Sequence, residues 1–347
     1  MTRAAARAGL LADSGWDAAD CCVLAADASF RSYERLTRPD GSAVLMDAPP
    51  DHEDVRPFMA LADLLRRCGF SAPTVMAADV AAGYLLLEDF GDASFNRILA
   101  REPSRERALY EAATDLLAAL HGFDPPARID LPAYGIVHDL PAYDLDMLTR
   151  EAALFGDWYL PALHDANAAQ GMAQAGLALW RETLAALPAR SPVLTLRDYH
   201  ADNLVWLEGR RGHAGVGLLD FQDAVRGHPA YDLVSLLQDA RRAVSPALEE
   251  AMIARYLARR AETGAPEDEP AFRHAYRLLG AQRAVKIIGI FMRLARRDGK
   301  LRYPAMIPGM WDYLERDLED PAIDGLRDWL DQVAPHSLRR KVPDIHV

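Results

Sequence analysis

Lysine is nearly absent from this chain of 347 residues. The only lysines are Lys286, Lys300 and Lys341, so the first 285 residues contain none. Arginine therefore supplies most of the basic charge, and 39 basic against 51 acidic residues leave a formal net charge of −12. Proteins that bind nucleic acids are usually basic, so this balance argues against a nucleic-acid partner.

Cysteine is equally scarce, with only Cys21, Cys22 and Cys68 in the chain. Three cysteines at this spacing make neither a disulfide framework nor a spaced metal site. Because Cys21 and Cys22 are neighbours in an apolar run, we expect all three thiols to be small buried groups in a reducing compartment.

Long apolar runs are missing as well. No run approaches the roughly 18 apolar residues that a membrane span needs. The N-terminal residues lead into a short amphipathic helix and lack the apolar core of a signal peptide. We therefore expect a cytoplasmic protein without a membrane segment. Its 347 residues exceed one ordinary core and predict two lobes.

Two apolar runs enclose a polar loop in which Asp198 and Asn203 lie five positions apart. A second apolar run ends at Asp220, followed by Phe221. This order, a strand, a loop with Asp-x-x-x-x-Asn and a strand pair ending in Asp-Phe, is typical of phosphoryl-transfer enzymes of the protein-kinase type.

The chemistry of phosphoryl transfer explains these residue types. An attacking hydroxyl needs a carboxylate that orients it and accepts its proton, which is the role predicted for Asp198. The nucleotide brings Mg²⁺, a hard cation that prefers oxygen ligands, and Asn203 and Asp220 offer an amide and a carboxylate oxygen. The alternative is that all three are ordinary turn formers or strand ends.

Six short runs carry a resemblance to a known family. They are Asp27-Ala-Ser-Phe-Arg31, Leu45-Met-Asp-Ala-Pro-Pro50, Arg197-Asp-Tyr-His200, Asp220-Phe-Gln-Asp-Ala224, Tyr231-Asp-Leu-Val-Ser-Leu236 and Arg297-Asp-Gly-Lys300. With the motif above, they make the chain resemble the aminoglycoside phosphotransferase family of kinase-like enzymes. Within that family it is most similar to the anomeric kinases of the cell-wall sugars N-acetylmuramate and N-acetylglucosamine.

The resemblance implies an α+β protein with a two-lobed protein-kinase-like fold. We expect a small N-terminal β-sheet lobe that binds the nucleotide over residues 1–88, a hinge at 89–92 and a larger, mainly helical catalytic lobe over 93–347. It further implies that ATP and Mg²⁺ are used to phosphorylate the C1 hydroxyl of an N-acetylated amino sugar in cell-wall recycling.

The expected nucleotide site departs from the kinase pattern in three places. The loop that contains Ser29, Phe30 and Arg31 has no glycine, and Met46 stands where kinases carry a lysine. The usual His of the catalytic loop is Leu196, so apolar packing is expected to take over its bracing role. We expect Arg31 to carry phosphate charge in place of the lysine, because arginine makes forked bonds to phosphate; the alternative is a solvated surface charge.

The remaining site predictions concern the hinge and the sugar. The resemblance makes Glu88, Asp89 and Phe90 the hinge, whose backbone would bind adenine, and makes Asp232 a brace for the catalytic loop. Three residues beside the reacting groups are predicted to contact the sugar: His200, Gln222 and Asp223.

The lactyl carboxylate of N-acetylmuramate calls for a cation, and Arg283, Lys286 and Arg31 are candidates. For Arg283 and Lys286 a solvated helix face is the favoured alternative. The helix predicted over 143–159 carries Glu151, Phe155, Trp158 and Tyr159. These residues either bind the sugar, with a ring covering its apolar face, or belong to the core.

Two rival functions remain open from sequence. The first is another acceptor within the same enzyme class, such as an aminoglycoside. The second is a nucleotide-binding scaffold with little catalysis, as the absent lysine and Leu196 allow. The presence of Asp198, Asn203 and Asp220 together favours a catalyst.

Overall fold

The computed structural model describes residues 2–24 and 30–342. It divides into two compact units. Unit 1 comprises residues 1–116, 126–141 and 202–224, and unit 2 comprises residues 117–125, 142–201 and 225–347. The division predicted from sequence into residues 1–88, 89–92 and 93–347 is contiguous and stays a prediction.

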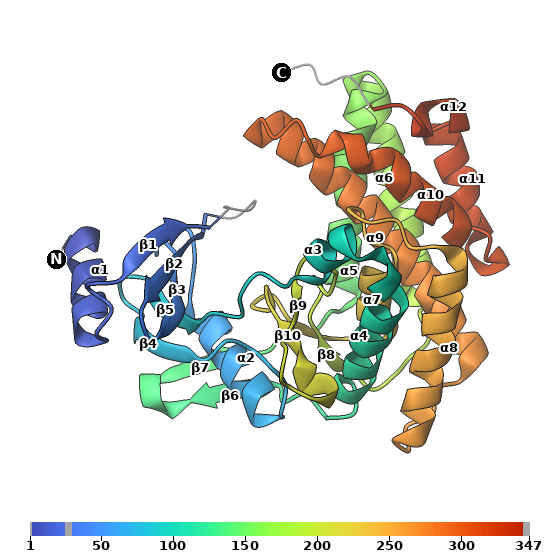
Figure 1. Ribbon diagram of the computed structural model, residues 1–347. Helices are drawn as coiled ribbons and strands as arrows, with labels where there is room; N and C mark the ends of the chain where they lie inside the picture. Colours follow the sequence, from blue (N-terminus) through green and yellow to red (C-terminus); the bar gives the residue numbers. More distant parts are fainter. Residues whose placement is uncertain (1, 25–29, 343–347) are drawn as a thin grey trace. The chain divides into compact units, whose positions relative to one another are not determined.

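Unit 1 is built on a five-stranded antiparallel sheet with the order β1-β2-β3-β5-β4. Its strands are β1 (Asp20–Val23), β2 (Ser32–Arg38), β3 (Gly41–Asp47), β4 (Val75–Asp79) and β5 (Tyr84–Glu88). Helix α1 (Arg3–Asp13) lies beside this sheet in Figure 1 and packs Leu11 onto Leu36 and Leu45. Short strands separated by turn residues, as the sequence predicts, thus form one sheet.

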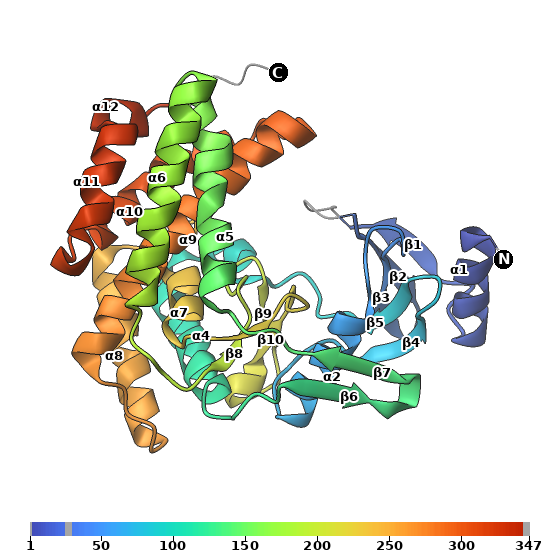
Figure 2. The same cartoon turned by 180° about the vertical axis from the view of Figure 1, so that it is seen from behind.

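The rest of unit 1 surrounds this sheet with short elements. These are α2 (Arg56–Arg67), α3 (Phe95–Arg101), the hairpin of β6 (Arg128–Leu131) and β7 (Ile136–Asp139), and the pair β9 (Leu204–Trp206) and β10 (Val216–Leu218). The β6–β7 hairpin contacts α2 and is seen from the front in Figure 2. Helix α4 (Glu106–Leu120) passes from unit 1 to unit 2.

Unit 2 is mainly helical. Its elements are α5 (Leu145–Leu154), α6 (Ala166–Ala185), β8 (Val193–Thr195), β11 (Val225–Gly227), α7 (Ala230–Leu237), α8 (Pro246–Glu262), α9 (Glu269–Asp298), α10 (Ile307–Asp317), α11 (Asp324–Val333) and α12 (His336–Arg339). Helices α5 and α6 lie side by side, and the 30-residue α9 contacts α5, α7 and α10 (Figure 2).

Two glycines set how closely helices approach in unit 2. A Cβ at Gly289 of α9 would lie 2.3 Å from the carbonyl carbon of Leu154, at the end of α5. A Cβ at Gly176 of α6 would lie 2.1 Å from the ring of Trp329 on α11. Only glycine leaves room for the Leu154 backbone and the Trp329 ring at these distances, so both helix pairs depend on it.

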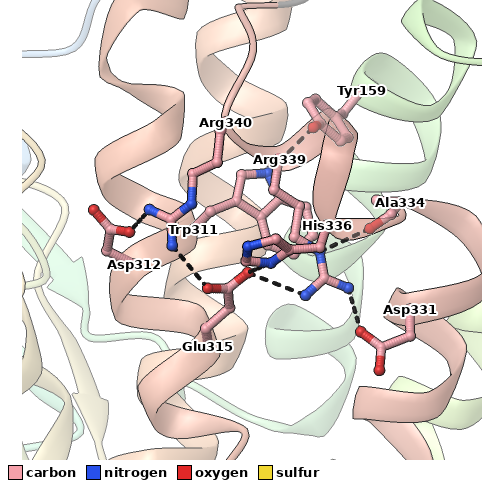
Figure 3. Close-up of polar contacts among 9 residues, drawn as sticks. All are labelled: Tyr159, Trp311, Asp312, Glu315, Asp331, Ala334, His336, Arg339 and Arg340. Atoms are coloured by element: carbon pink, nitrogen blue, oxygen red, sulfur yellow. Dashed lines mark hydrogen bonds and ion pairs between the residues drawn. The ribbon is translucent and has the colours of Figure 1, made fainter.

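The last turns of the chain are fixed by a cluster of charges (Figure 3). Arg339 of α12 is buried, and its guanidinium lies 4.7 Å from the ring centroid of Trp311 on α10. The same guanidinium binds the carboxylates of Glu315 and Asp331 and donates to the Ala334 carbonyl at 2.7 Å. One side chain therefore links α10, α11 and α12.

Most predicted helices and strands are present, with shifted ends. Apolar residues at three- and four-residue steps predict a helix over residues 51–68; the helix begins at Arg56, where Pro57 suits the first turn. The helix predicted over 143–159 ends at Leu154 and continues as one π-helical turn, Phe155–Tyr159. Phe155 and Tyr159 are fully buried, so the core interpretation is correct for both.

The prediction that the cysteines are buried was wrong. Cys21, Cys22 and Cys68 are all exposed. Cys21 and Cys22 lie on β1, an edge strand whose four residues are all exposed, and Cys68 follows the last turn of α2. An apolar sequence run at a sheet edge does not guarantee burial, because nothing has to cover that strand.

A second correction concerns α9. Arg283 was expected on a solvated face, but it is buried and donates to the Gln238 carbonyl at 3.1 Å and to Ser235 Oγ at 3.0 Å. The Lys286 side chain is 13% exposed and forms an ion pair with Glu151. Helix α9 is enclosed by α5, α7 and α10, so it has little free face.

Among the described residues, no helix has the length and apolar character required to cross a membrane.

Candidate active site

Unit 1 contains a cavity of about 440 Å³ at one side of its sheet. Its lining includes these predicted site residues: Arg31, Glu88, Asp89, Phe90, Asn203 and Asp220. The structure therefore brings together residues from the first hairpin, the predicted hinge and the β9–β10 region. Ser29 lies outside the described residues, and Phe30 is exposed, with its ring stacked 4.4 Å from that of His52.

Arg31 is anchored between two acids at this cavity. Its guanidinium lies 3.2 Å from Asp220 Oδ1 and 3.8 Å from Glu53 Oε2. Burial opposes the charge of Arg31, but Tyr33, Asp220 and Glu53 outweigh it and raise the pKa of the guanidinium. Its side chain is only 12% exposed, so the solvated-charge alternative does not describe it. Met46, at the position of the kinase lysine, is buried in β3.

The predicted hinge is held by arginines. Asp89 forms an ion pair with Arg35 at 2.7 Å, and Glu88 accepts from the Thr74 hydroxyl at 2.7 Å and from Arg210. The ring of Phe90 lies directly over Gly217 of β10, where a Cβ would come within 2.7 Å of it. These contacts leave the hinge backbone at the cavity in a fixed conformation.

Asn203 and Asp220 are linked through the backbone of the β9–β10 pair. The Leu219 N–H donates to the Asn203 carbonyl at 2.9 Å, which places the two residues on paired segments. The Asp220 side chain accepts from the Gln222 amide at 2.9 Å, and the same amide lies 3.2 Å from Asp223. Two of the predicted sugar contacts, Gln222 and Asp223, thus lie beside this carboxylate.

The donor set at the cavity fits a hard divalent cation. Asn203 and Asp220 both line it and offer amide and carboxylate oxygens, the ligand types that Mg²⁺ prefers. Within the described residues, no group of three or more His, Cys, Asp and Glu side chains is arranged to hold a metal. An ion at this cavity would accordingly take its remaining ligands from water or substrate.

In unit 2, the loop before Asp198 has an unusual backbone. Arg197 has φ of 69°, the left-handed region, and the Asp198 N–H donates to the Leu196 carbonyl at 2.9 Å. This is a three-residue turn, a strained conformation for a residue with a side chain. Asp220 in unit 1 has φ of 57°, so both sequence motifs place a residue in the left-handed region.

Asp232 of α7 braces this loop. Its two carboxylate oxygens accept from the backbone N–H of Leu196 at 2.6 Å and of Arg197 at 2.8 Å. The hydroxyl of Ser235 donates to the Arg197 carbonyl at 3.0 Å. The predicted bracing role of Asp232 is confirmed, and Leu196 is buried, as expected for an apolar replacement of the family's histidine.

The charges around Asp198 keep it ionised. Burial by neighbouring protein raises the pKa of its carboxyl, but Lys286, His200, Arg283 and Arg197 outweigh this effect and lower it. The Asp198 side chain is exposed to solvent, which the role predicted for it in orienting a substrate requires. His200 is buried and lies 3.3 Å from Arg241, and burial lowers its pKa; its contact with the sugar stays a prediction.

The sequence analysis did not single out Arg35, and it named Glu151 only as one of four possible sugar contacts on its helix, without its partner Arg197. Arg35 lines the cavity two positions after Tyr33 and four after Arg31. The period of two in a strand was the signal that would have found it, since alternate residues share a face. No sequence signal pairs Arg197 with Glu151, because 46 residues separate them.

Comparisons with known proteins agree with this geometry. The Phosphotransferase enzyme family matches residues 20–269, so the chain belongs to that family and is a phosphotransferase. The N-acetylmuramate/N-acetylglucosamine kinase of Caulobacter vibrioides is 40% identical, covering 97% of this chain and 98% of its own length. The enzyme of the same name from Pseudomonas aeruginosa is 37% identical, covering 88% and 87%.

Solved structures support the fold. A choline/ethanolamine kinase family protein from Mesorhizobium loti matches with a TM-score of 0.61 and 17% identity, covering 96% of this chain and all of the other. The ADP-bound aminoglycoside phosphotransferase APH(2'')-Ib matches with a TM-score of 0.54 and 16% identity, over 85% and 92% of the two chains. The predicted two-lobed kinase-like fold is confirmed.

Proposed function

We propose that this protein transfers the γ-phosphate of ATP to the anomeric hydroxyl of N-acetylmuramate and N-acetylglucosamine. The observation that carries the proposal is the identity of 33 to 40% with four kinases named for these two sugars. The product, a sugar 1-phosphate, would enter nucleotide-sugar synthesis during cell-wall recycling in the cytoplasm, where ATP is available.

In the proposed reaction, Asp198 orients the C1 hydroxyl and accepts its proton as the oxygen attacks the γ-phosphorus. Its lowered pKa keeps the carboxylate ionised at neutral pH, so its main contribution is orientation. The brace from Asp232 and the strained Arg197 fix the direction of this carboxylate. Positioning of this kind accounts for much of the catalysis in phosphoryl transfer.

The phosphates of ATP belong in the unit 1 cavity. Arg31 supplies positive charge in place of the missing lysine, and the backbone of residues 88–90 binds adenine. Asn203 and Asp220 would hold Mg²⁺, which when bound would supply positive charge that offsets the charge of the phosphates. Substituting Arg31 by Ala is expected to raise the KM for ATP, and an unchanged KM would remove Arg31 from the site.

Phosphorus NMR tests the proposal directly. The purified protein is incubated with ATP and Mg²⁺ and, separately, with N-acetylglucosamine, N-acetylmuramate and kanamycin. We expect a new phosphorus signal coupled to the anomeric proton with either sugar. Asp198→Asn is expected to lower kcat by about 10²- to 10⁴-fold, the usual contribution of a positioned acid or base.

Other outcomes of this experiment are equally informative. Phosphate on kanamycin alone would keep the enzyme class and overturn the acceptor. ATP binding with no transfer to any acceptor in the wild type would favour a nucleotide-binding scaffold.

A further inference from the structure

Five side chains in unit 2 form a polar cluster beside the catalytic loop. Glu151 of α5 accepts from Lys286 of α9 at 2.9 Å, and also from Arg197 and from the Tyr143 hydroxyl. Lys286 donates as well to the Tyr231 hydroxyl at 3.2 Å. The rings of Tyr143 and Tyr231 meet edge to face with centroids 4.8 Å apart, which encloses the charges on one side.

The crossing of α5 and α9 creates this cluster. Gly289 lets α9 approach the end of α5 at Leu154. Lys286 lies three residues before Gly289, and Glu151 lies three residues before Leu154, so each is about one helical turn from the point of closest approach. The position of Lys286 is therefore set by the helix backbones.

The cluster carries more positive than negative charge. Lys286 and Arg197 share the single carboxylate of Glu151. Glu151 is nearly saturated by its three donors, and its cationic neighbours outweigh burial and lower its pKa. The cluster thus has one positive charge in excess, which the ionised carboxylate of Asp198, the residue after Arg197, offsets in part through its favourable interaction with Lys286 and Arg197.

Lys286 retains bonding capacity. An ammonium group has three N–H donors, of which Glu151 and Tyr231 take two. Among the residues that the structure describes, none takes the third. The side chain is 13% exposed, so it is not fully enclosed by protein. Lys286 also favours the ionised form of Asp198 and so lowers the pKa of that carboxyl.

The other two candidate cations, Arg283 and Arg31, are bound to different groups. Arg283 is buried with its terminal nitrogens bonded to Gln238 and Ser235. Arg31 lies at the unit 1 cavity with Glu53 and Asp220. Lys286 is thus the best-placed of the three cations predicted for the acceptor.

We propose that Lys286, with Arg197 beside it and Glu151 holding both, forms an anion subsite that binds the carboxylate of an acidic sugar acceptor. The inference rests on the proposed function. N-acetylmuramate carries a lactyl carboxylate that N-acetylglucosamine lacks, so Lys286 is a specificity-determining residue for the acidic sugar and is dispensable for binding the neutral one.

Steady-state kinetics with both sugars test the subsite. Lys286→Gln keeps a polar head and removes the charge. We expect kcat/KM for N-acetylmuramate to fall about 10- to 100-fold, the usual effect of losing a charge-assisted hydrogen bond. With N-acetylglucosamine the change should stay below about threefold. Lys286→Arg should recover part of the loss, and the exposed Lys341→Gln should behave as wild type.

An equal loss with both sugars in Lys286→Gln would overturn the subsite, because it would mean that Lys286 only supports the fold around Glu151. No loss with N-acetylmuramate would overturn it as well. A wild type that phosphorylates neither sugar would contradict the proposed function itself, which separates the two failures.

A second measurement needs no variant and covers the case in which Lys286→Gln fails to fold. The methyl ester of N-acetylmuramate carries no charge and differs from the acid by one added methyl group. The wild type is expected to use the ester about 10- to 100-fold less efficiently than the acid. Equal efficiency for acid and ester would show that no cation binds the carboxylate.

Discussion

Two effects of the surroundings change the pKa of the Asp232 carboxyl in opposite directions. Burial in α7 raises its pKa to about 7, although the N–H groups of Leu196 and Arg197 favour the ionised form. A protonated carboxyl has one oxygen that acts as a donor, and it then accepts less well from the loop. The residue that braces the catalytic loop is therefore sensitive to pH in the neutral range.

This position has a measurable effect on stability. An unfolded Asp loses its proton near pH 4, whereas Asp232 in the fold holds it to about pH 7. Between these pH values the folded chain binds one more proton than the unfolded chain. The contribution of Asp232 to the free energy of unfolding therefore falls as pH rises, by up to about 4 kcal/mol. Urea denaturation from pH 5 to 7.5 should give Asp232→Asn a less negative slope with pH than the wild type. Identical slopes would contradict the assignment.

Arg339 is expected to matter for stability more than its neighbour. Arg339→Ala removes the stacking on Trp311 and leaves Glu315 and Asp331 without their shared partner, at a cost of about 2 kcal/mol. Arg340→Ala is the matched control, because that side chain is 45% exposed and its ion pairs contribute under about 1 kcal/mol. Thermal unfolding of both variants gives the comparison, and equal losses would refute the role of Arg339.

At the scale of elements, the contact between α5 and α9 leaves no room for a side chain at Gly289. Gly289→Ala places a methyl group 2.3 Å from the Leu154 backbone, and backbone yields less than a side chain. We expect a loss of about 3 kcal/mol together with weaker activity toward N-acetylmuramate, since Lys286 and Glu151 separate. Gly171→Ala in α6 has open space around it and should gain about 0.5 to 1 kcal/mol. Chemical denaturation measures both, and a harmless Gly289→Ala would contradict the close approach.

The contact between β10 and the predicted hinge gives a prediction about nucleotide binding. Gly217→Ala would push against the Phe90 ring at 2.7 Å and shift it. We expect the KM for ATP to rise about fivefold, equivalent to roughly 1 kcal/mol, while the KM for the sugar stays nearly constant. Equal changes in both KM values would point to general disruption of unit 1.

The sequence predicted helices and strands well wherever a single local signal determines where they begin or end. The Ser245-Pro246 pair in the sequence predicts an N-cap followed by proline at the first helical position, and these residues do cap and open α8, because capping chemistry is local. The short apolar run Tyr84–Glu88, flanked by turns, predicts a strand for a similar reason, and β5 has the same bounds. By contrast, no local sequence signal predicts the π-helical turn after Leu154, because that turn depends on packing against α9 and α6.

At the scale of the whole molecule, the compact units are discontiguous in sequence. A prediction made along the chain divides it into consecutive segments. In the structure, residues 126–141 and 202–224 belong to the same unit as the N-terminal residues. Motif spacing predicted the cavity residues Asn203 and Asp220, since the family's chemistry fixes their types. The Glu151 cluster depends on helix crossings between distant segments, which no spacing in the sequence encodes.

The exposure of the cysteines has a practical consequence. Cys21, Cys22 and Cys68 all lie in unit 1, and the chain contains no others. A thiol-reactive fluorophore or spin label consequently tags unit 1, where we propose that ATP binds, and leaves unit 2 unmarked. A hydrogen bond to Glu34 raises the pKa of Cys21, and burial raises that of Cys68, so mildly alkaline buffer will favour the reaction. The native cysteines therefore allow a label to be placed on unit 1 alone, so nucleotide binding can be followed spectroscopically without engineered residues.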